Sequence, residues 1–237
     1  DRQKELLLQT KHAHESELKK AAFVNSVCHE VRTPLNCIMG FSELLCAEEI
    51  TPESRAQYCE IIRDNRRQLR FLFDDMLEGA YLENLHAPLP CQYTNLCAVC
   101  QAQLRIMKVR YPKPGIVYKG AIPVAEIALN TSDKYLTILI SALLGNAYKF
   151  TQEGTISLEC DRLGDDRVFV AVADTGCGIP PAKRNDIFGL PSDDSKATPG
   201  LSLALCRLIA RHLSGNISLD EAYTAGARFI FTIPAKP

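Results

Sequence analysis

Residues 23–45 read FVNSVCHEVRTPLNCIMGFSELL, and this stretch decides the fold of the N-terminal part of the chain. Apolar or small side chains recur in and just before it at alternating steps of three and four residues: Ala21, Val24, Cys28, Val31, Leu35, Ile38, Ser42 and Leu45. This spacing is typical of a helix that packs into a bundle along one seam. His29 directly follows a seam residue, so we expect its ring beside the core and within reach of solvent. Pro34 should bend the helix, because it leaves the carbonyl of Glu30 without its usual donor.

A second helix is expected after a short connection. Thr51 offers an N-cap hydroxyl, Pro52 suits the first helical turn, and Glu53 lies near the positive end of the helix dipole. We expect the first helix over residues 1–47 and the second to end near Leu85. Two long helices joined by a short turn form an antiparallel hairpin with half of its seam uncovered. A dimeric four-helix bundle would cover that seam, so the sequence predicts a homodimer.

The rest of the chain alternates between strand-like and helix-like segments. Helices are expected over 95–109 and 132–148, after Pro180 and over 201–213, and strands over 115–119, 126–130, 155–161, 167–173, 216–220 and 227–233. This order is typical of an α/β sandwich, in which helices cover one face of a sheet. The predicted domains are therefore a helical hairpin over 1–86, a proline-bearing linker over 87–90, and an α/β domain over 91–237.

Composition excludes several classes of function. The net charge is −1 and no basic stripe is present, so nucleic-acid binding is not expected. No apolar run approaches the ~20 residues of a membrane-spanning helix, and no signal peptide is visible. We therefore expect no membrane contact from this segment. Because residue 1 already lies in a helix-like polar stretch, we also expect the chain to be part of a longer protein, whose full-length form can be membrane-anchored.

The chain contains 10 cysteines, which is a high number. Most lie inside apolar patterns, and we interpret them as reduced, buried side chains of a cytosolic protein. Cys97 and Cys100 form a CxxC pair, but no second pair and no histidine pair follows at metal-binding spacing. We therefore expect neither a zinc site nor redox chemistry there.

His29 begins a motif that continues with Glu30, Arg32, Thr33, Pro34 and Leu35. A lone histidine on a helix is usually a surface residue without a catalytic role. The whole string, however, resembles the phosphoacceptor box of sensor histidine kinases. The resemblance implies that His29 accepts a phosphoryl group and that Glu30 serves as its base or orients its ring. Thr33 resembles the residue that positions a water for dephosphorylating the partner, although an ordinary helix threonine is the alternative.

Further motifs follow in the α/β part: LLGNAYKFT (143–151), DTGCGI (174–179), Ile187-Phe188 with a polar stretch leading to GLSLAL (200–205), and TAGARFIFTIP (224–234). Asn146 offers an oxygen suited to a hard cation, Lys149 a charge for phosphate, and Phe150 a ring for a purine. Asp174, at a strand end, can accept a hydrogen bond from an exocyclic amine. The glycines after Asp174 allow a close backbone approach to a ligand.

Together, the order and spacing of these motifs resemble the Bergerat-type ATP-binding domain of histidine kinases. With the phosphoacceptor box, this resemblance covers nearly the whole chain and implies ATP and Mg²⁺ as cofactors. Asn146 would hold Mg²⁺ against the phosphates with help from Lys149, and Asp174 would read the adenine amine. The other implied contacts are Gly176 and Gly178 close to the nucleotide, the N–H groups of Gly200 and Leu201 at phosphate, and Ile179 and Leu203 as walls for adenine.

The chain departs from the family pattern in two places. Ala142 replaces the first asparagine of the asparagine box. The second glycine box, over 198–203, keeps Gly200 but has lost the other glycines, and Pro199 removes a backbone donor. Each change can weaken phosphate binding by about one hydrogen bond, or ~0.5–3 kcal/mol.

The resemblance implies a cytoplasmic kinase that autophosphorylates His29 from ATP and passes the phosphoryl group to an aspartate of a response-regulator receiver domain. The linker over 87–90 is the expected hinge between the two domains. The altered second glycine box supports an alternative, a catalytically weak or inactive dimeric signalling scaffold. In a third interpretation, dephosphorylation of the regulator through Thr33 dominates over kinase activity.

Overall fold

The structure is a computed structural model, and it describes residues 25, 27–47, 50–85, 87–184, 187–189 and 201–235. The chain divides into two compact units: the first comprises Asp1–Ala80 and Gly189–Leu201, and the second comprises Tyr81–Phe188 and Ser202–Pro237. One boundary therefore lies inside a helix, between Ala80 and Tyr81. In the described part of the chain, no helix is both long and apolar enough to cross a membrane.

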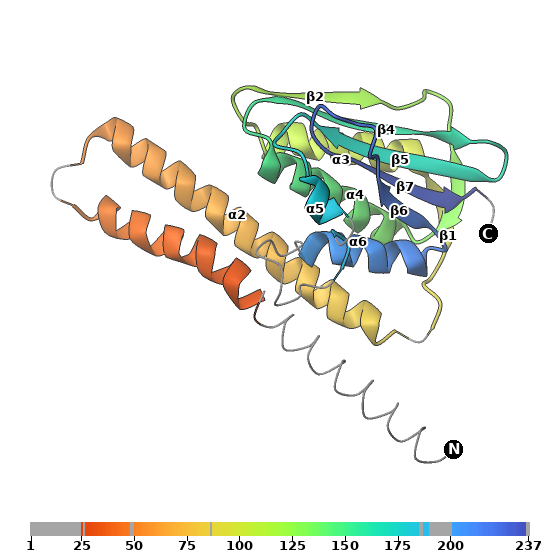
Figure 1. Cartoon of the computed structure of the whole chain (residues 1–237), viewed down its shortest axis with the longest axis horizontal. Coiled ribbons are helices and arrows are strands. Elements are labelled where there is room, and N and C mark those ends of the chain that lie inside the picture. The colour runs from red at the N-terminus through yellow and green to blue at the C-terminus, as the bar shows by residue number, and fades with distance from the viewer. Residues whose placement is uncertain are drawn as a thin grey trace, which may run out of the picture. The chain divides into compact units, whose positions relative to one another are not determined.

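The first unit contains a helical hairpin (Figure 1). One helix covers residues 27–45 and α2 covers Pro52–Glu83. The backbone N–H of Ser54 donates to Oγ1 of Thr51 at 3.2 Å, which confirms the predicted helix start. The rings of Phe41 and Tyr58, with centroids 5.3 Å apart, join the two helices. Most of the predicted helix before Val27 lies outside the described residues.

The second unit begins with the last turn of α2. Its further elements are β1 (Gln92–Asn95), α3 (Leu96–Arg110), β2 (Ile116–Ala121), β3 (Ala128–Thr131), α4 (Asp133–Phe150), β4 (Gly154–Leu163), β5 (Arg167–Asp174), α5 (Pro181–Arg184), α6 (Leu201–His212), β6 (Asn216–Leu219) and β7 (Arg228–Pro234). Leu89, in the predicted linker, is buried in the core of this unit.

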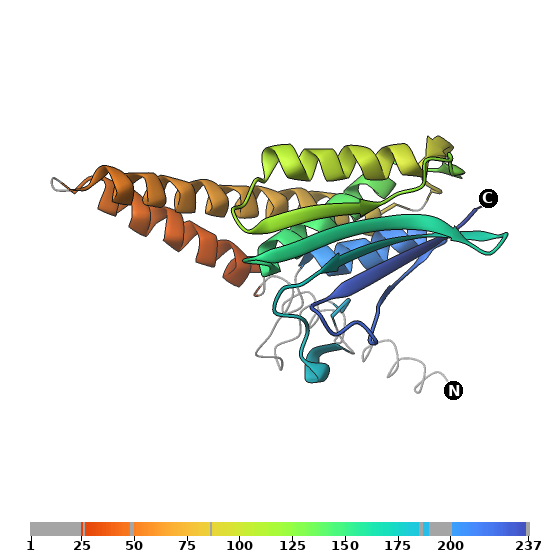
Figure 2. The ribbon, with the colours of Figure 1, turned by 90° about the horizontal axis from the view of Figure 1, so that it is seen from above.

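Five of these strands form one sheet, in the order β2-β4-β5-β7-β6. The β2–β4 pair is parallel and the other pairs are antiparallel. Helices α3, α4 and α6 lie on one face of this sheet (Figures 1 and 2). Every second residue of β7 is buried, namely Phe229, Phe231 and Ile233, as a sheet covered on one face requires. The predicted α/β sandwich is therefore confirmed.

Strand β1 was not expected from the sequence. It pairs with β3 in a separate two-stranded sheet, so β3 does not join the main sheet. Residues 92–95 read QYTN and lack the alternating apolar pattern of a strand. Their extended conformation depends on pairing with a segment more than thirty residues away, at Ala128–Thr131.

The hydrophobic core places the C-terminal end of α4 beside the C-terminal end of β5. Helix α4 is anchored by fully buried leucines and isoleucines: Leu136, Leu139, Ile140, Leu143 and Leu144. Strand β5 is central and buried along most of its length. Its last residue is Asp174, and Gly176 and Cys177, which follow it, contact the C-terminal end of α4 at Phe150. The two segments singled out from the sequence thus meet at one edge of the sheet.

All ten cysteines lie within the described residues and carry free thiols. Those at 97, 100, 160 and 206 are buried, as expected, whereas those at 28, 46, 91 and 177 are exposed. Among the described side chains, no cluster of three or more His, Cys, Asp or Glu residues could hold a metal ion.

Candidate functional site

Asp174 is the central side chain of the candidate site. It is 5% exposed, and its Oδ1 accepts hydrogen bonds from the backbone N–H groups of Gly176 at 2.9 Å and Ala227 at 3.4 Å. Burial raises the pKa of Asp174, and these two backbone hydrogen bonds offset part of the increase. Within the described residues, the Oδ2 atom has no hydrogen-bond partner, so it is available to a ligand donor.

Three glycines bring the backbone close to Asp174. A Cβ atom on Gly176 would overlap the carbonyl oxygen of Phe150, and one on Gly226 would overlap the carbonyl oxygen of Asp174. Gly178 has a φ of 65°, in the left-handed region that favours glycine. Only residues without a side chain therefore fit at the first two positions, and the third is strained for any other residue.

A cavity of about 280 Å³ borders this loop. One wall is the segment Gly176–Pro180, which includes the half-buried Ile179, and the opposite wall is Tyr223–Gly226. Arg184 also lines the cavity, and its Nε donates to the carbonyl of Ile179 at 3.0 Å. Three of the lining residues are glycines, namely Gly176, Gly178 and Gly226, so the backbone of both walls is accessible to a ligand that approaches closely.

The end of α4 forms a second side of the site. The backbone N–H of Cys177 donates to the carbonyl of Phe150 at 3.4 Å, which connects α4 to the glycine loop. In the described part of the chain, two buried polar atoms near this end have no partner: Nδ2 of Asn146 and Oγ1 of Thr151. Lys149 is exposed, and its Nζ lies 5.2 Å from the ring centroid of Phe150. Unpartnered buried donors of this kind call for a polar ligand.

The segment whose N–H groups are predicted to contact phosphate, at the start of α6, is described only in part. Leu201 is the first residue of α6 and is buried, and Leu203 is half-buried against the core. Gly200, and the polar stretch before it, lie outside the described residues.

The phosphoacceptor motif lies on the helix over 27–45. His29 is exposed and Glu30 is half-buried. The hydroxyl of Thr33 donates to the backbone carbonyl of His29 at 3.2 Å. Pro34 is buried, and the helix continues through it without interruption. His29 therefore presents its ring to solvent from a regular helix, as a group that reacts with an external phosphate must.

Two positively charged residues near the site were missed by sequence reasoning. Lys113 donates to the carbonyl of Thr151 at 2.8 Å, and its Nζ lies 5.2 Å from the centroid of the Tyr148 ring. Arg228 follows Ala227, which contacts Asp174, and forms ion pairs with two carboxylates. Lys113 bonds a residue 38 positions away, and Arg228 bonds Glu159, which is 69 positions away, so no local pattern could have indicated these two contacts.

Two protein-family models match the chain. The His Kinase A (phospho-acceptor) domain matches residues 19–85, and the histidine kinase-, DNA gyrase B- and HSP90-like ATPase matches residues 131–237. The first match contains His29 and the second contains Asn146 and Asp174. The second unit is therefore an ATPase-type nucleotide-binding domain, and ATP is the nucleotide that its family binds.

Similar proteins support the same assignment. Histidine protein kinase DivJ from Caulobacter vibrioides is 29% identical over 91% of this chain, which spans 37% of DivJ. The aerobic respiration control sensor protein ArcB from Escherichia coli is 26% identical over 91% of the chain, which spans 29% of ArcB. The chain thus corresponds to roughly a third of the length of these proteins.

Solved structures extend the comparison to the fold. Full-length ShkA, in complex with AMPPNP, is 27% identical, with a TM-score of 0.60, and the match covers 90% of this chain and 45% of that one. The fold is also that of histidine kinase ThkA, solved with the response regulator TrrA, at a TM-score of 0.67 and 21% identity; that match covers 96% of this chain and 64% of that one. With a phosphoacceptor domain followed by the matching ATPase domain, the chain belongs to the sensor histidine kinases.

Proposed function

We propose that this chain transfers the γ-phosphoryl group of ATP to His29 and then passes it to an aspartate of a response-regulator receiver domain. The observation that carries the proposal is the buried Asp174 carboxylate, with one oxygen open to a ligand beside a glycine loop, in a chain that also exposes His29 on a helix. Neither feature alone gives a kinase, because the donor site and the acceptor must occur together.

Asp174 recognises the adenine base in this proposal. Its open Oδ2 accepts a hydrogen bond from the exocyclic amine, while Gly176 and Gly178 let the backbone approach the ring. Ile179 and Leu203 provide apolar walls, and Phe150 lies against the purine. A buried carboxylate whose other oxygen is fixed by backbone donors is held in one orientation, so it discriminates an amine from a carbonyl.

The end of α4 receives the phosphates. The unpartnered Nδ2 of Asn146 fits this role, because a phosphate oxygen would satisfy it while the amide oxygen remains available to a cation. Bound Mg²⁺ supplies charge neutralisation to the phosphates. Lys149 adds a positive charge, and the backbone N–H groups of Gly200 and Leu201 contact phosphate at the start of α6.

His29 is the nucleophile. One ring nitrogen forms the N–P bond while the bond from the γ-phosphorus to the bridging oxygen breaks and ADP leaves. Glu30 keeps that nitrogen deprotonated or orients the ring. In the second step, an aspartate carboxylate of the receiver domain attacks phosphohistidine, and neutral His29 is released. Thr33 then positions a water that hydrolyses the phosphoaspartate, which gives the chain a regulator-dephosphorylating activity.

The partners follow from the same chemistry. ThkA has been solved in complex with a response regulator, and this supports a receiver domain as the phosphoryl acceptor. Exposed apolar side chains of the hairpin include one pair on each helix: Leu35 and Met39 on the first helix, and Phe73 and Leu77 on α2. Each helix presents its pair at a spacing of four residues, so both pairs form short stripes that a second hairpin can cover in a homodimer. ATP and receiver domains are cytoplasmic, and we place the chain there.

Incubation with γ-labelled ATP and Mg²⁺ tests the proposal. The expected product is acid-labile, base-stable label on the wild-type chain, absent from His29→Ala although that variant still binds ATP. Addition of a purified receiver domain should then remove the label from the kinase. ATP binding without any labelling of the wild type would instead support the scaffold interpretation.

A further inference from the structure

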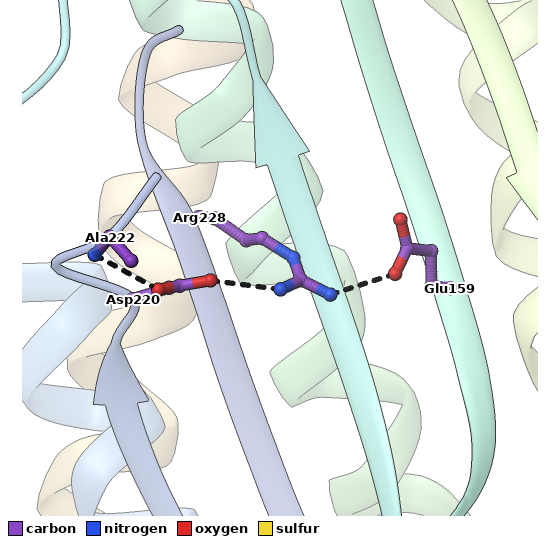
Figure 3. Close-up of polar contacts among 4 residues, drawn as sticks. All are labelled: Glu159, Asp220, Ala222 and Arg228. Atoms are coloured by element: carbon purple, nitrogen blue, oxygen red, sulfur yellow. Dashed lines mark hydrogen bonds and ion pairs between the residues drawn. The ribbon is translucent and has the colours of Figure 1, made fainter. Parts of the chain in front are cut away.

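Arg228 forms an ion cluster on the face of the sheet opposite the helices. Its Nη1 donates to Oδ2 of Asp220 and its Nη2 to Oε2 of Glu159, both at 2.8 Å. Figure 3 shows the guanidinium between the two carboxylates. Arg228 is on β7 and Glu159 on β4, so the side chain spans the intervening strand β5. The cluster therefore connects β4, β7 and the residue that directly follows β6 at one level of the sheet.

This level is the one at which β5 ends in Asp174. Arg228 pairs with Ala173 in the β5–β7 register. The preceding residue, Ala227, exchanges contacts with Asp174: its carbonyl accepts from the Asp174 N–H at 2.9 Å, and its own N–H donates to Oδ1 at 3.4 Å. Arg228 thus anchors the backbone that holds one carboxylate oxygen of Asp174.

The same cluster fixes the loop that faces the glycine segment. Oδ1 of Asp220 accepts from the N–H of Ala222 at 3.1 Å, and the Asp220 carbonyl accepts from the N–H of Tyr223 at 3.2 Å. Tyr223 lines the cavity. Burial, and next the charge of Asp174, raise the pKa of the Tyr223 hydroxyl. Asp220 therefore shapes a wall of the cavity while it binds Arg228.

We propose that Arg228 is a positioning residue for nucleotide recognition: through Asp220 and Glu159 it holds the 220–227 loop in the conformation that orients Asp174 toward the base. The inference rests on the proposed function, in that Asp174 reads adenine. Arg228 does not touch the nucleotide. Its role is to support a recognising group whose own position depends on neighbouring backbone.

A purely stabilising role is the competing explanation. The side chains of Arg228, Glu159 and Asp220 are 24%, 34% and 21% exposed, and partly exposed ion pairs contribute little to global stability. A stabilising role would therefore change thermal stability slightly and leave the choice between nucleotides unaltered. A positioning role changes the preference for ATP over GTP, because that preference depends on the orientation of Asp174.

The chain offers a matched control. Arg167 lies at the other end of β5. It is an even number of positions from Ala173, which pairs with Arg228, so its side chain lies on the same face of the sheet as that of Arg228. Its Nη2 donates to Oγ1 of Thr232 on β7 at 2.9 Å. Arg167→Met removes an arginine that connects β5 to β7 at the end of β5 far from Asp174, whereas the Arg228 side chain connects β7 to Glu159 on β4.

The experiment measures dissociation constants for ATP and GTP, with Mg²⁺, by calorimetry on the full chain, together with melting temperatures. Arg228→Met should weaken ATP binding about tenfold, the effect of roughly one well-placed hydrogen bond, and reduce the ATP-over-GTP preference by a similar factor. Arg167→Met should leave both within about twofold. Arg228→Lys should recover only part of the loss, since an ammonium lacks the planar fork that reaches both carboxylates.

Two further variants keep the outcome decisive. Arg228→Met is set aside if it lowers the melting temperature more than Arg167→Met does. Glu159→Gln is then measured in its place, because glutamine removes the negative charge and keeps the size of the side chain. It should also reduce the preference for ATP over GTP. An unchanged ATP-over-GTP preference in both Arg228→Met and Glu159→Gln overturns the inference. Asp174→Asn separates this from the proposed function: if it too leaves the preference unchanged, then the assignment of Asp174 to adenine is what fails.

Discussion

The two units of the chain hold their functional groups in different ways. In the helical unit, His29 and Thr33 are exposed side chains on a regular helix, and the hydrogen bond between them involves backbone already in that helix. In the sheet unit, Asp174 is 5% exposed and is surrounded by glycine backbone in close contact. We therefore expect substitutions of the functional residues to leave folding stability nearly unchanged in the helical unit, and to change both stability and ligand binding in the sheet unit.

Truncation of one leucine in each unit gives the largest contrast. Leu143 is fully buried, so Leu143→Ala should cost about 2–5 kcal/mol of unfolding free energy. Leu77 is 71% exposed in the single chain, and Leu77→Ala should cost under about 0.5 kcal/mol when the protein is dilute.

Urea denaturation at two protein concentrations checks both values. The Leu143→Ala cost should be independent of concentration, whereas the Leu77→Ala cost should grow with concentration if this side chain is covered in a dimer. Equal, concentration-independent costs would contradict the proposed difference between the units.

Glycine-to-alanine changes should have opposite signs in the two units. A Cβ on Gly226 would overlap the backbone of Asp174, so Gly226→Ala should destabilise by about 1–3 kcal/mol and weaken ATP binding. A Cβ on Gly40 meets nothing within 4 Å, and Gly40→Ala should stabilise by up to about 1 kcal/mol through helix propensity. Thermal melts with and without ATP distinguish the two, and a neutral Gly226→Ala would show that the loop can move away.

Asp174→Asn tests the coupling of chemistry to stability within the sheet unit. Burial holds the pKa of Asp174 above its ordinary value of 3.8, so ionisation at neutral pH opposes folding. The amide should therefore raise the melting temperature at pH 7 while it removes the preference for ATP.

The sign of the pH dependence follows from the raised folded-state pKa. As pH falls through it, the wild type gains a proton in the folded state, and its stability deficit relative to Asp174→Asn should shrink and vanish below the ordinary value. ATP affinity should fall over the same range, because protonated Asp174 no longer accepts the amine hydrogen bond freely. A melting temperature of Asp174→Asn below that of the wild type at pH 7 would contradict this account.

The smallest effect is expected at Thr33. Thr33→Val removes a hydroxyl that donates to a carbonyl on an exposed helix surface, so stability should change by under about 0.5 kcal/mol. ATP binding and His29 labelling should be retained, and dephosphorylation of a phosphorylated receiver domain should be lost. Retention of that dephosphorylation would leave Thr33 as an ordinary helix residue.

Much of this molecule could be predicted from local sequence signals. Thr51 and Pro52 indicated the start of α2, and Asn95 lies directly before α3, where its side chain accepts a hydrogen bond from the N–H of Ala98. Asp174 was identified because an acid follows an apolar strand. These signals are local, since a cap or a strand end is determined by residues within a few positions.

Features that depend on distant residues could not be predicted in this way. Strand β1 is a polar tetrapeptide that is extended because it pairs with β3. The Arg228 cluster joins residues from three separate segments, and one of its hydrogen bonds connects positions 69 residues apart. Local patterns in a single sequence therefore do not indicate the side chains that support the site.

The most direct test of the central claim is to map the phosphoryl group after the chain is incubated with ATP and Mg²⁺. The chain contains 5 histidines. Tandem mass spectrometry under neutral conditions, which preserve phosphohistidine, should find the phosphoryl group on His29 and on no other histidine. Phosphorylation at a different residue, or none despite bound ATP, would contradict the account of His29 as the acceptor served by the Asp174 site.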